Sequence, residues 1–202
     1  MSKKKGFLPR VLMLVALACL GSVFLAPLWQ ITLDAPQFPG GLYLDIWVDG
    51  FSGDEEGGDI IQNINILNHY IGMQYIEPDS IPELTYFPYI IYVMLTLGLI
   101  VMLVDRAWSY FIWTAILVVL GILGVYDFYL WLYDYGHNLD PNAPIQVPGM
   151  VYQPPLFGEK YLLNFLAKSY PHVGGWFVGL SIVLSSLAFI FSKKRKNETI
   201  IT

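Results

Sequence analysis

The chain has 202 residues, of which 55% are hydrophobic and only 13% are charged, and its formal net charge at pH 7 is −5. This charged fraction is about half that of a soluble protein, so too few polar side chains are present to cover a soluble surface. The composition excludes a disordered chain and predicts a membrane protein. Basic residues do not cluster outside the tails, which argues against a nucleic-acid partner. The single cysteine, Cys19, excludes an internal disulfide and any site built only of cysteines.

Four charge-free runs are each near the 20 residues that a helix needs to cross a bilayer core of about 30 Å. Backbone groups in lipid must be bonded within their own segment, so each run predicts a transmembrane helix. The apolar part of the first run extends over residues 11–29. The four runs lie between Arg10 and Asp34, between Glu83 and Asp105, between Arg106 and Asp127, and between Lys168 and Lys193.

The basic residues predict the orientation of these helices. With four spans, nine of the eleven Lys and Arg residues fall on one side, and the positive-inside rule then places both termini in the cytoplasm. An alternative is a signal sequence cleaved near Ala18 and Cys19, but the apolar run continues to Trp29 and favours a retained helix. The nine basic residues are Lys3, Lys4, Lys5, Arg10, Arg106, Lys193, Lys194, Arg195 and Lys196.

The first polar segment, 30–83, is predicted to lie outside the bilayer. Apolar and polar residues alternate over 42–48, which indicates a short strand. The acidic, glycine-rich stretch 51–59 lacks the spacing of a calcium loop and is interpreted as a solvated loop. An amphipathic helix is predicted over 59–77, with Asp59 as N-cap and Pro78 as its end. Its apolar stripe consists of Ile60, Ile64, Leu67 and Ile71.

The second outer segment, 127–171, begins as an extension of the third predicted span. Five prolines between Pro141 and Pro155 predict an irregular lid, and 158–169 is predicted to form a short interfacial helix. We expect the 30–83 and 127–171 segments to pack together as one outer cap on a single membrane domain, 1–202. The predicted fold class is therefore an all-α membrane protein with four transmembrane helices and a small irregular cap.

Motifs that would indicate catalysis are missing from the sequence. No triad is readable from spacing, and neither a phosphate loop nor an HExxH motif occurs. Ionisable residues are absent from the middle of the predicted spans, which argues against a proton pathway and against a haem held at membrane depth. The sequence therefore favours a non-enzymatic protein.

Soft metal ligands are concentrated in the outer segments. Imidazole and thioether together suit copper, particularly copper(I). Residues 69 and 73 lie four apart in the predicted helix and would share one face, and Asp134 could orient His137. The alternative is that these side chains only make hydrogen bonds and that Met73 fills an apolar gap. The candidate metal ligands are His69, Met73, His137, Met150 and His172.

Three long motifs resemble a known family of integral membrane proteins. They are LDAPQFPGGL at 33–42, INILNHYIGMQYIEPDSIPEL at 64–84 and YGHNLDPNAPIQVPGMVYQPPLFGEKYLLNF at 135–165. They resemble the NosB-like proteins encoded in the atypical, clade II gene clusters of nitrous oxide reductase. The resemblance implies location in a bacterial inner membrane, with protein partners of periplasmic nitrous oxide respiration, and an accessory role in assembling the copper enzyme or supplying it with copper.

Two other functions stay open at this level. One is a subunit that docks quinol or a cytochrome for electron transfer, which requires a pocket at the outer membrane boundary lined by Trp131, tyrosines and an Asp or His. The other is a purely structural subunit of a larger membrane complex. A metal role requires at least two of the five soft ligands to reach one point.

Overall fold

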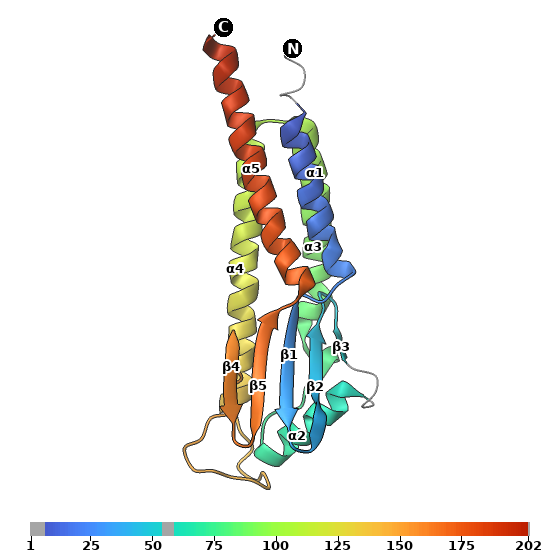
Figure 1. Cartoon of the computed structure of the whole chain (residues 1–202), viewed down its shortest axis with the longest axis vertical. Coiled ribbons are helices and arrows are strands. Elements are labelled where there is room, and N and C mark those ends of the chain that lie inside the picture. Colours follow the sequence, from blue (N-terminus) through green and yellow to red (C-terminus); the bar gives the residue numbers. More distant parts are fainter. Residues whose placement is uncertain (1–6, 54–58, 202) are drawn as a thin grey trace.

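The computed structural model describes residues 7–53 and 59–201, with side chains up to Arg195, and it places a bundle of helices above an antiparallel sheet (Figure 1). The bundle contains α1, α3, α4 and α5, whereas α2 packs beside the sheet. The helices are α1 (Leu8–Gly21), α2 (Ile60–Ile71), α3 (Pro82–Val104), α4 (Ala107–His137) and α5 (Val173–Ile201), with 3₁₀ turns η1 (Ser22–Phe24) and η3 (Pro78–Ser80). The strands are β1 (Trp29–Ala35), β2 (Phe38–Ile46), β3 (Phe51–Gly53), β4 (Gly158–Leu162) and β5 (Phe165–Pro171).

The prediction of an all-α fold is wrong, because the outer region contains a five-stranded antiparallel sheet in the order β3-β2-β1-β5-β4. The central strand β1 buries Ile31, Leu33 and Ala35 in strict alternation, which is the period of a half-buried strand. Its first residue, Trp29, was predicted to be the last residue of the first apolar span. The start of the strand was therefore assigned to a helix.

The predicted interfacial helix at 158–169 is also wrong, because this stretch forms the β4–β5 hairpin. Leu162 pairs with Phe165 across a two-residue turn. Leu163 in this turn has a φ of 55°, in the left-handed region that tight hairpin turns require. Phe165 and Ala167 are buried in alternation with exposed or half-buried neighbours, so the hairpin adds two strands to the sheet.

The prediction of four spans is corrected to three helices that are long and apolar enough to cross a membrane within the described residues: α3, α4 and the 173–195 part of α5. The first predicted span was expected to be apolar and helical as far as Trp29. Its helical part instead covers only Leu8–Phe24, about 26 Å at the rise of an α-helix. Pro27 lacks a backbone donor and the chain then enters β1, which ends the helix early.

The bundle is joined to the sheet at two places: β5 leads into α5 through His172 alone, and α1 leads into β1 through η1 and residues 25–28 (Figure 1). Trp29 pairs with Pro171 at the bundle end of these adjacent strands. The backbone N–H groups of His172 and Gly174 donate to the carbonyls of Leu28 and Pro27 at 3.0 and 2.8 Å. These bonds fasten the start of α5 to the segment that connects α1 with β1.

Helix α2 begins as predicted and ends earlier than predicted. The Asp59 side chain caps it by accepting from the N–H of Ile61 at 3.0 Å, and all four residues of the apolar stripe are buried. The helix stops at Ile71 because Gly72 has a φ of 80°, a conformation that suits glycine at a helix end. The residues from Met73 to Glu77 therefore lie outside the helix.

A single hydrophobic core joins the two outer segments. One face of the sheet is covered by α2, by the last turns of α4 and by the proline-rich stretch, which is irregular as the prolines predict. The stretch is fixed by backbone bonds, since the N–H of Ile145 donates to the Tyr70 carbonyl at 2.9 Å and that of Tyr152 donates to the Gly136 carbonyl at 3.1 Å. Residues from 30–83 and from 127–171 thus contact each other throughout this core.

The opposite end of the bundle carries the described basic residues of the N-terminal and C-terminal helices, around Asp105. This residue ends α3 with a φ of 49°, and its carboxylate contacts Arg10 of α1 at 3.1 Å and Arg195 of α5 at 2.9 Å. Its other oxygen accepts from the Tyr110 hydroxyl of α4 at 3.1 Å. Lys3, Lys4 and Lys5, and residues 54–58 of the predicted acidic loop, lie outside the described residues.

Candidate functional site

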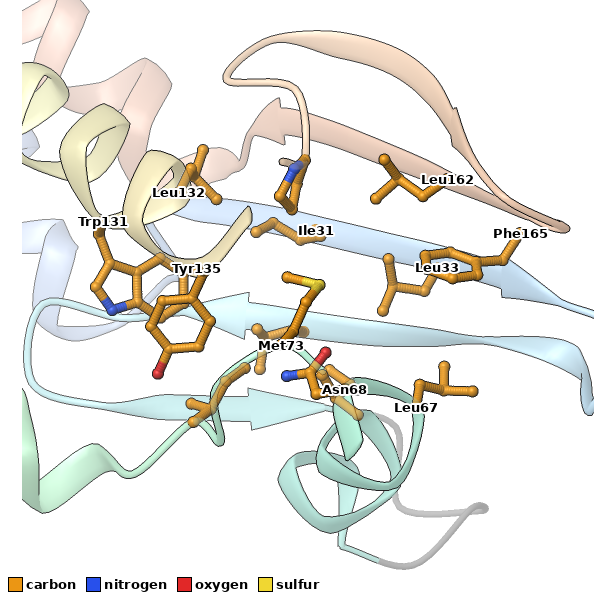
Figure 2. A pocket seen from close by; sticks show the side chains of 14 residues that line it. Ile31, Leu33, Leu67, Asn68, Met73, Trp131, Leu132, Tyr135, Leu162 and Phe165 are labelled. Carbon is orange, nitrogen blue, oxygen red and sulfur yellow. The ribbon is translucent and has the colours of Figure 1, made fainter. Parts of the chain in front are cut away.

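The two nearest candidate metal ligands, His69 and Met73, point in different directions. His69 is exposed, and its Nδ1 lies 3.2 Å from the Tyr75 hydroxyl. Met73 follows the helix-ending Gly72 and projects into an apolar cavity of about 40 Å³, where Figure 2 shows it near Ile31 and Tyr135. The prediction that residues 69 and 73 share a helical face is wrong, because Met73 lies beyond the helix.

The remaining candidate ligands are distributed over three places. The His137 ring stacks on Tyr133 at 3.8 Å, and its Nδ1 lies 2.8 Å from that residue's carbonyl oxygen. His172 lies at the β5–α5 junction, with a buried Nδ1 that has no hydrogen-bond partner among the described residues. Met150 packs at the edge of the core.

The expected pairing of Asp134 with His137 is not formed, since the Asp134 carboxylate accepts from Asn138 and from Gln74. Over residues 7–53 and 59–195, no group of three or more His, Cys, Asp or Glu side chains is arranged to hold a metal ion. The assignment of the five soft ligands to a copper site stays a prediction.

The larger hollow is an open cleft of about 480 Å³ between the 74–83 connector and the last turns of α4. We call it the boundary cleft, because the connector leads directly into α3 and α4 continues into the bundle. Its walls combine three carboxylates with three aromatic rings. The carboxylates are those of Glu77, Glu83 and Asp134, and the rings are those of Tyr75, Trp131 and Tyr135.

The connector that forms one wall is held by side-chain hydrogen bonds. The side-chain amide of Asn65 in α2 makes two hydrogen bonds to the backbone of Ile76. Its NH₂ group donates to the Ile76 carbonyl at 3.1 Å, and its oxygen accepts from the Ile76 N–H at 2.7 Å. The buried Tyr135 donates its hydroxyl hydrogen to the Tyr75 carbonyl at 2.7 Å. Both anchors reach the main chain, so they hold the backbone of the connector at Tyr75 and Ile76.

The opposite wall is one face of α4. Trp131, Asp134 and Tyr135 lie three and four residues apart, which places them on adjacent turns of one face. The Trp131 and Tyr135 rings pack with centroids 4.3 Å apart. The same two rings also line the small apolar cavity that contains Met73 (Figure 2), so they border both hollows.

The electrostatic character of the boundary cleft is negative. Its three carboxylates come from separate elements, and none of the described residues that line it is a Lys, Arg or His. The Gln74 amide donates to Asp134 at 3.4 Å. The site can therefore receive a cationic or hydrogen-bond-donating group against aromatic walls.

Sequence reasoning identified only part of this cleft. Trp131 was predicted to line a pocket at the outer membrane boundary together with tyrosines and an Asp or His, whereas Glu77 and Glu83 were not connected with it. The missed acidic residues Glu77 and Glu83 flank the stretch between Pro78 and Pro82. Each proline begins a helical segment, η3 or α3, and proline at the first position of a helix is the signal that a new segment starts there.

No protein family model matches the chain, and no curated protein matches it significantly.

Proposed function

We propose that the chain is a non-catalytic accessory membrane protein of periplasmic nitrous oxide reduction, which docks a periplasmic partner and assists assembly of the copper enzyme. The resemblance of the outer motifs supports the biological setting. The observation that carries the docking role is the face of the sheet turned away from the hydrophobic core, which we call the outer sheet face. It includes the exposed Tyr43, Glu159, Tyr161 and Tyr170 and the half-buried Gln30, Thr32, Asp34, Asp45, Leu166 and Lys168.

The outer sheet face has the composition of an interaction surface. Tyr161 is 73% exposed and Tyr170 is 41% exposed, and Phe157 beside them is 65% exposed. Aromatic residues are enriched at protein interfaces, whereas a purely solvated sheet face is polar. Polar pairs connect neighbouring strands on the same face, since Lys168 contacts Asp34 at 2.8 Å and Gln30 donates to Asp45 at 2.8 Å.

The proposed orientation places the Asp105 end in the cytoplasm and the sheet in the periplasm of a bacterial inner membrane. The start of α1 and the end of α5 lie at the same end of the bundle as the α3–α4 turn (Figure 1), and the basic residues concentrated there follow the positive-inside rule. The test uses reporters fused after Thr202 and inserted at Gly149. A cytoplasmic reporter should be active only at the first position and a periplasmic reporter only at the second; the reverse pattern would contradict this orientation.

The docking role is tested by co-purification from native membranes, with metal analysis and an optical spectrum of the captured complex. Replacing Phe157 and Tyr161 with serine should abolish capture of the partner and slow nitrous oxide reduction by cells. Tyr70→Ser is the matched control, because Tyr70 is 50% exposed on α2, away from the outer sheet face. Equal capture by all three proteins, or normal nitrous oxide reduction in cells lacking the chain, would refute the proposal.

A quinol-docking role is the second candidate, and the boundary cleft favours it. Trp131, two tyrosines and Asp134 line the cleft, which meets the requirement for a ring-binding pocket with a hydrogen-bonding carboxylate. Bound quinol in the purified complex, lost in Trp131→Ala and retained in Phe157→Ser, would favour this role over partner docking through the outer sheet face.

A further inference from the structure

We infer that the boundary cleft binds the ammonium group of an amine-headed phospholipid, such as phosphatidylethanolamine, from the leaflet on the sheet side. This inference is independent of the proposed role of the outer sheet face. It rests on the charge of the cleft, on its aromatic walls and on the level at which it opens.

The charge of the cleft calls for a cation larger than a metal ion. Glu77, Glu83 and Asp134 project from the connector, from the start of α3 and from α4. Among the described residues these carboxylates do not form a group that could hold a metal. Carboxylates spread around about 480 Å³ instead complement an organic cation, whose charge is distributed over a larger group.

The aromatic walls favour an ammonium group in particular. Cations are attracted to the faces of tryptophan and tyrosine rings, and such cages are a recurrent means of binding alkylammonium ligands. Tyr75 is 52% exposed and lines the cleft together with the packed Trp131–Tyr135 pair. A neutral quinol would use the rings and one carboxylate, but it would leave the other two carboxylates without a counter-charge.

The cleft opens near the expected depth of the lipid headgroups, so we expect the amine to belong to a lipid. Pro82 and Glu83, which line it, are the first residues of the candidate span α3. Helix α4 has 31 residues, about 46 Å in length, so its last turns extend beyond a core of about 30 Å. Exposed tyrosines gather along the sheet-side halves of both helices, as expected near the lipid–water interface. They are Tyr86, Tyr89 and Tyr92 of α3 and Tyr126, Tyr129 and Tyr133 of α4.

The test measures lipid retention by native mass spectrometry on the purified full-length chain in detergent. The probes are phosphatidylethanolamine, phosphatidylglycerol and N-acetylated phosphatidylethanolamine with identical acyl chains. We expect the wild type to retain phosphatidylethanolamine about tenfold better than either of the others, because only it carries an ammonium group. Free ethanolamine at the same concentration should not displace it, since the lipid is anchored by its tails.

The variant Glu83→Gln with Asp134→Asn should reduce this preference to near unity, whereas Glu159→Gln on the outer sheet face is the charge-matched control and should keep it. The inference is overturned if the wild type retains all three lipids equally, if the double variant keeps the preference, or if a neutral quinol with a matched tail displaces the lipid at equal concentration. The comparison of the three lipids uses only the wild type, so it decides the question even if the double variant is unstable.

Discussion

Arg195 and Asp105 are 90 positions apart in the chain, and the Arg195 guanidinium donates to both the carboxylate and the backbone carbonyl of Asp105, at 2.9 and 3.0 Å. With Arg10 bound to the same carboxylate, one acidic residue connects α1, α3 and α5 at the end of the bundle. Hydrogen bonds to charged groups are stronger than neutral ones, and their loss leaves the partners unsatisfied.

Asp105→Asn should therefore lower the free energy of unfolding by about 2 kcal/mol. Asparagine tolerates the left-handed backbone of this position and can still accept from Tyr110, so the change isolates the charge. The measurement is the thermal midpoint in detergent, with Arg10→Gln as a milder comparison because the Arg10 side chain is 48% exposed. An Asn variant as stable as the wild type would show that the ion pairs contribute nothing.

Gly174→Ala should destabilise the junction between bundle and sheet by about 2 kcal/mol. A Cβ at Gly174 would lie 2.6 Å from the Ala26 carbonyl oxygen and 2.7 Å from that of Pro27, and these backbone atoms cannot move aside easily. Gly179→Ala is the control on the same helix, since a Cβ there meets nothing within 4 Å and alanine favours helix. Equal thermal midpoints for the two variants would contradict the close approach.

Ile64→Ala should cost about 2–4 kcal/mol, because Ile64 is 4% exposed in the core beneath the sheet. The control is Ile66→Ala, which removes a side chain that is 45% exposed on the same helix and should cost less than about 0.5 kcal/mol. Limited proteolysis of the outer segments reports the difference. Ile64→Asp should make these segments fully accessible to protease, because it places a charge in the core. Unchanged protease resistance in that variant would refute the packing of α2 on the sheet.

Lys168 and Asp34 predict a pH-dependent contribution to stability. The hydrogen bond to Asp34 and its negative charge raise the pKa of the Lys168 amine above its ordinary value of 10.5. A group with a raised folded-state pKa stabilises below its unfolded pKa, and this stabilisation is lost as the pH rises through the folded pKa. The thermal midpoint of Lys168→Gln should therefore be lower than that of the wild type at about pH 8. The two midpoints should become equal at a pH high enough to neutralise the Lys168 amine of the wild type. A difference in thermal midpoint that stays constant up to high pH would show that the effect comes from packing of the Lys168 side chain and not from its charge.

Copper(I) competition against a chelator tests the five soft ligands. Met73 is packed in the apolar cavity and His69 faces outward, so we expect His69→Ala and Met73→Leu to retain as much copper as the wild type. A selective loss of copper in both variants would show that the outer region rearranges to bring these ligands together.

The parts of this fold that depend on local chemistry could be predicted, and the parts that depend on distant pairing could not. Asp59 and the buried stripe of α2 are readable because an N-cap and a helical period are local signals. The buried face of β5 consists of Phe165, Ala167 and Ser169. Because two of these three residues are small, the alternation of apolar and polar residues is weak and did not indicate a strand. The predicted end of α2 at residue 77 was wrong because Gly72 was not recognised as a helix end.

The boundary cleft shows the same limit for a site. Trp131 and Asp134 could be assigned to one face of a helix from their spacing alone. Their proximity to Tyr75 depends on the Tyr135 hydroxyl, which bonds a carbonyl 60 residues earlier in the chain. Such contacts exist only in the folded molecule, and without an expected ligand set no sequence pattern distinguishes Glu83 from any other acidic residue near a helix start.

The sheet is coupled to the bundle because β5 leads into α5 through His172 alone, and because hydrogen bonds from His172 and Gly174 fasten the α1–β1 segment to the start of α5. A helix that tilts to match a thinner or thicker hydrocarbon core cannot do so independently of its strand, because the β1–β5 ladder is paired from Trp29–Pro171 to Asp34–Leu166. A change in the tilt of α1 and α5 therefore changes the orientation of the whole sheet relative to the membrane plane. The angle that the outer sheet face presents above the membrane would then follow the thickness of the lipid around it.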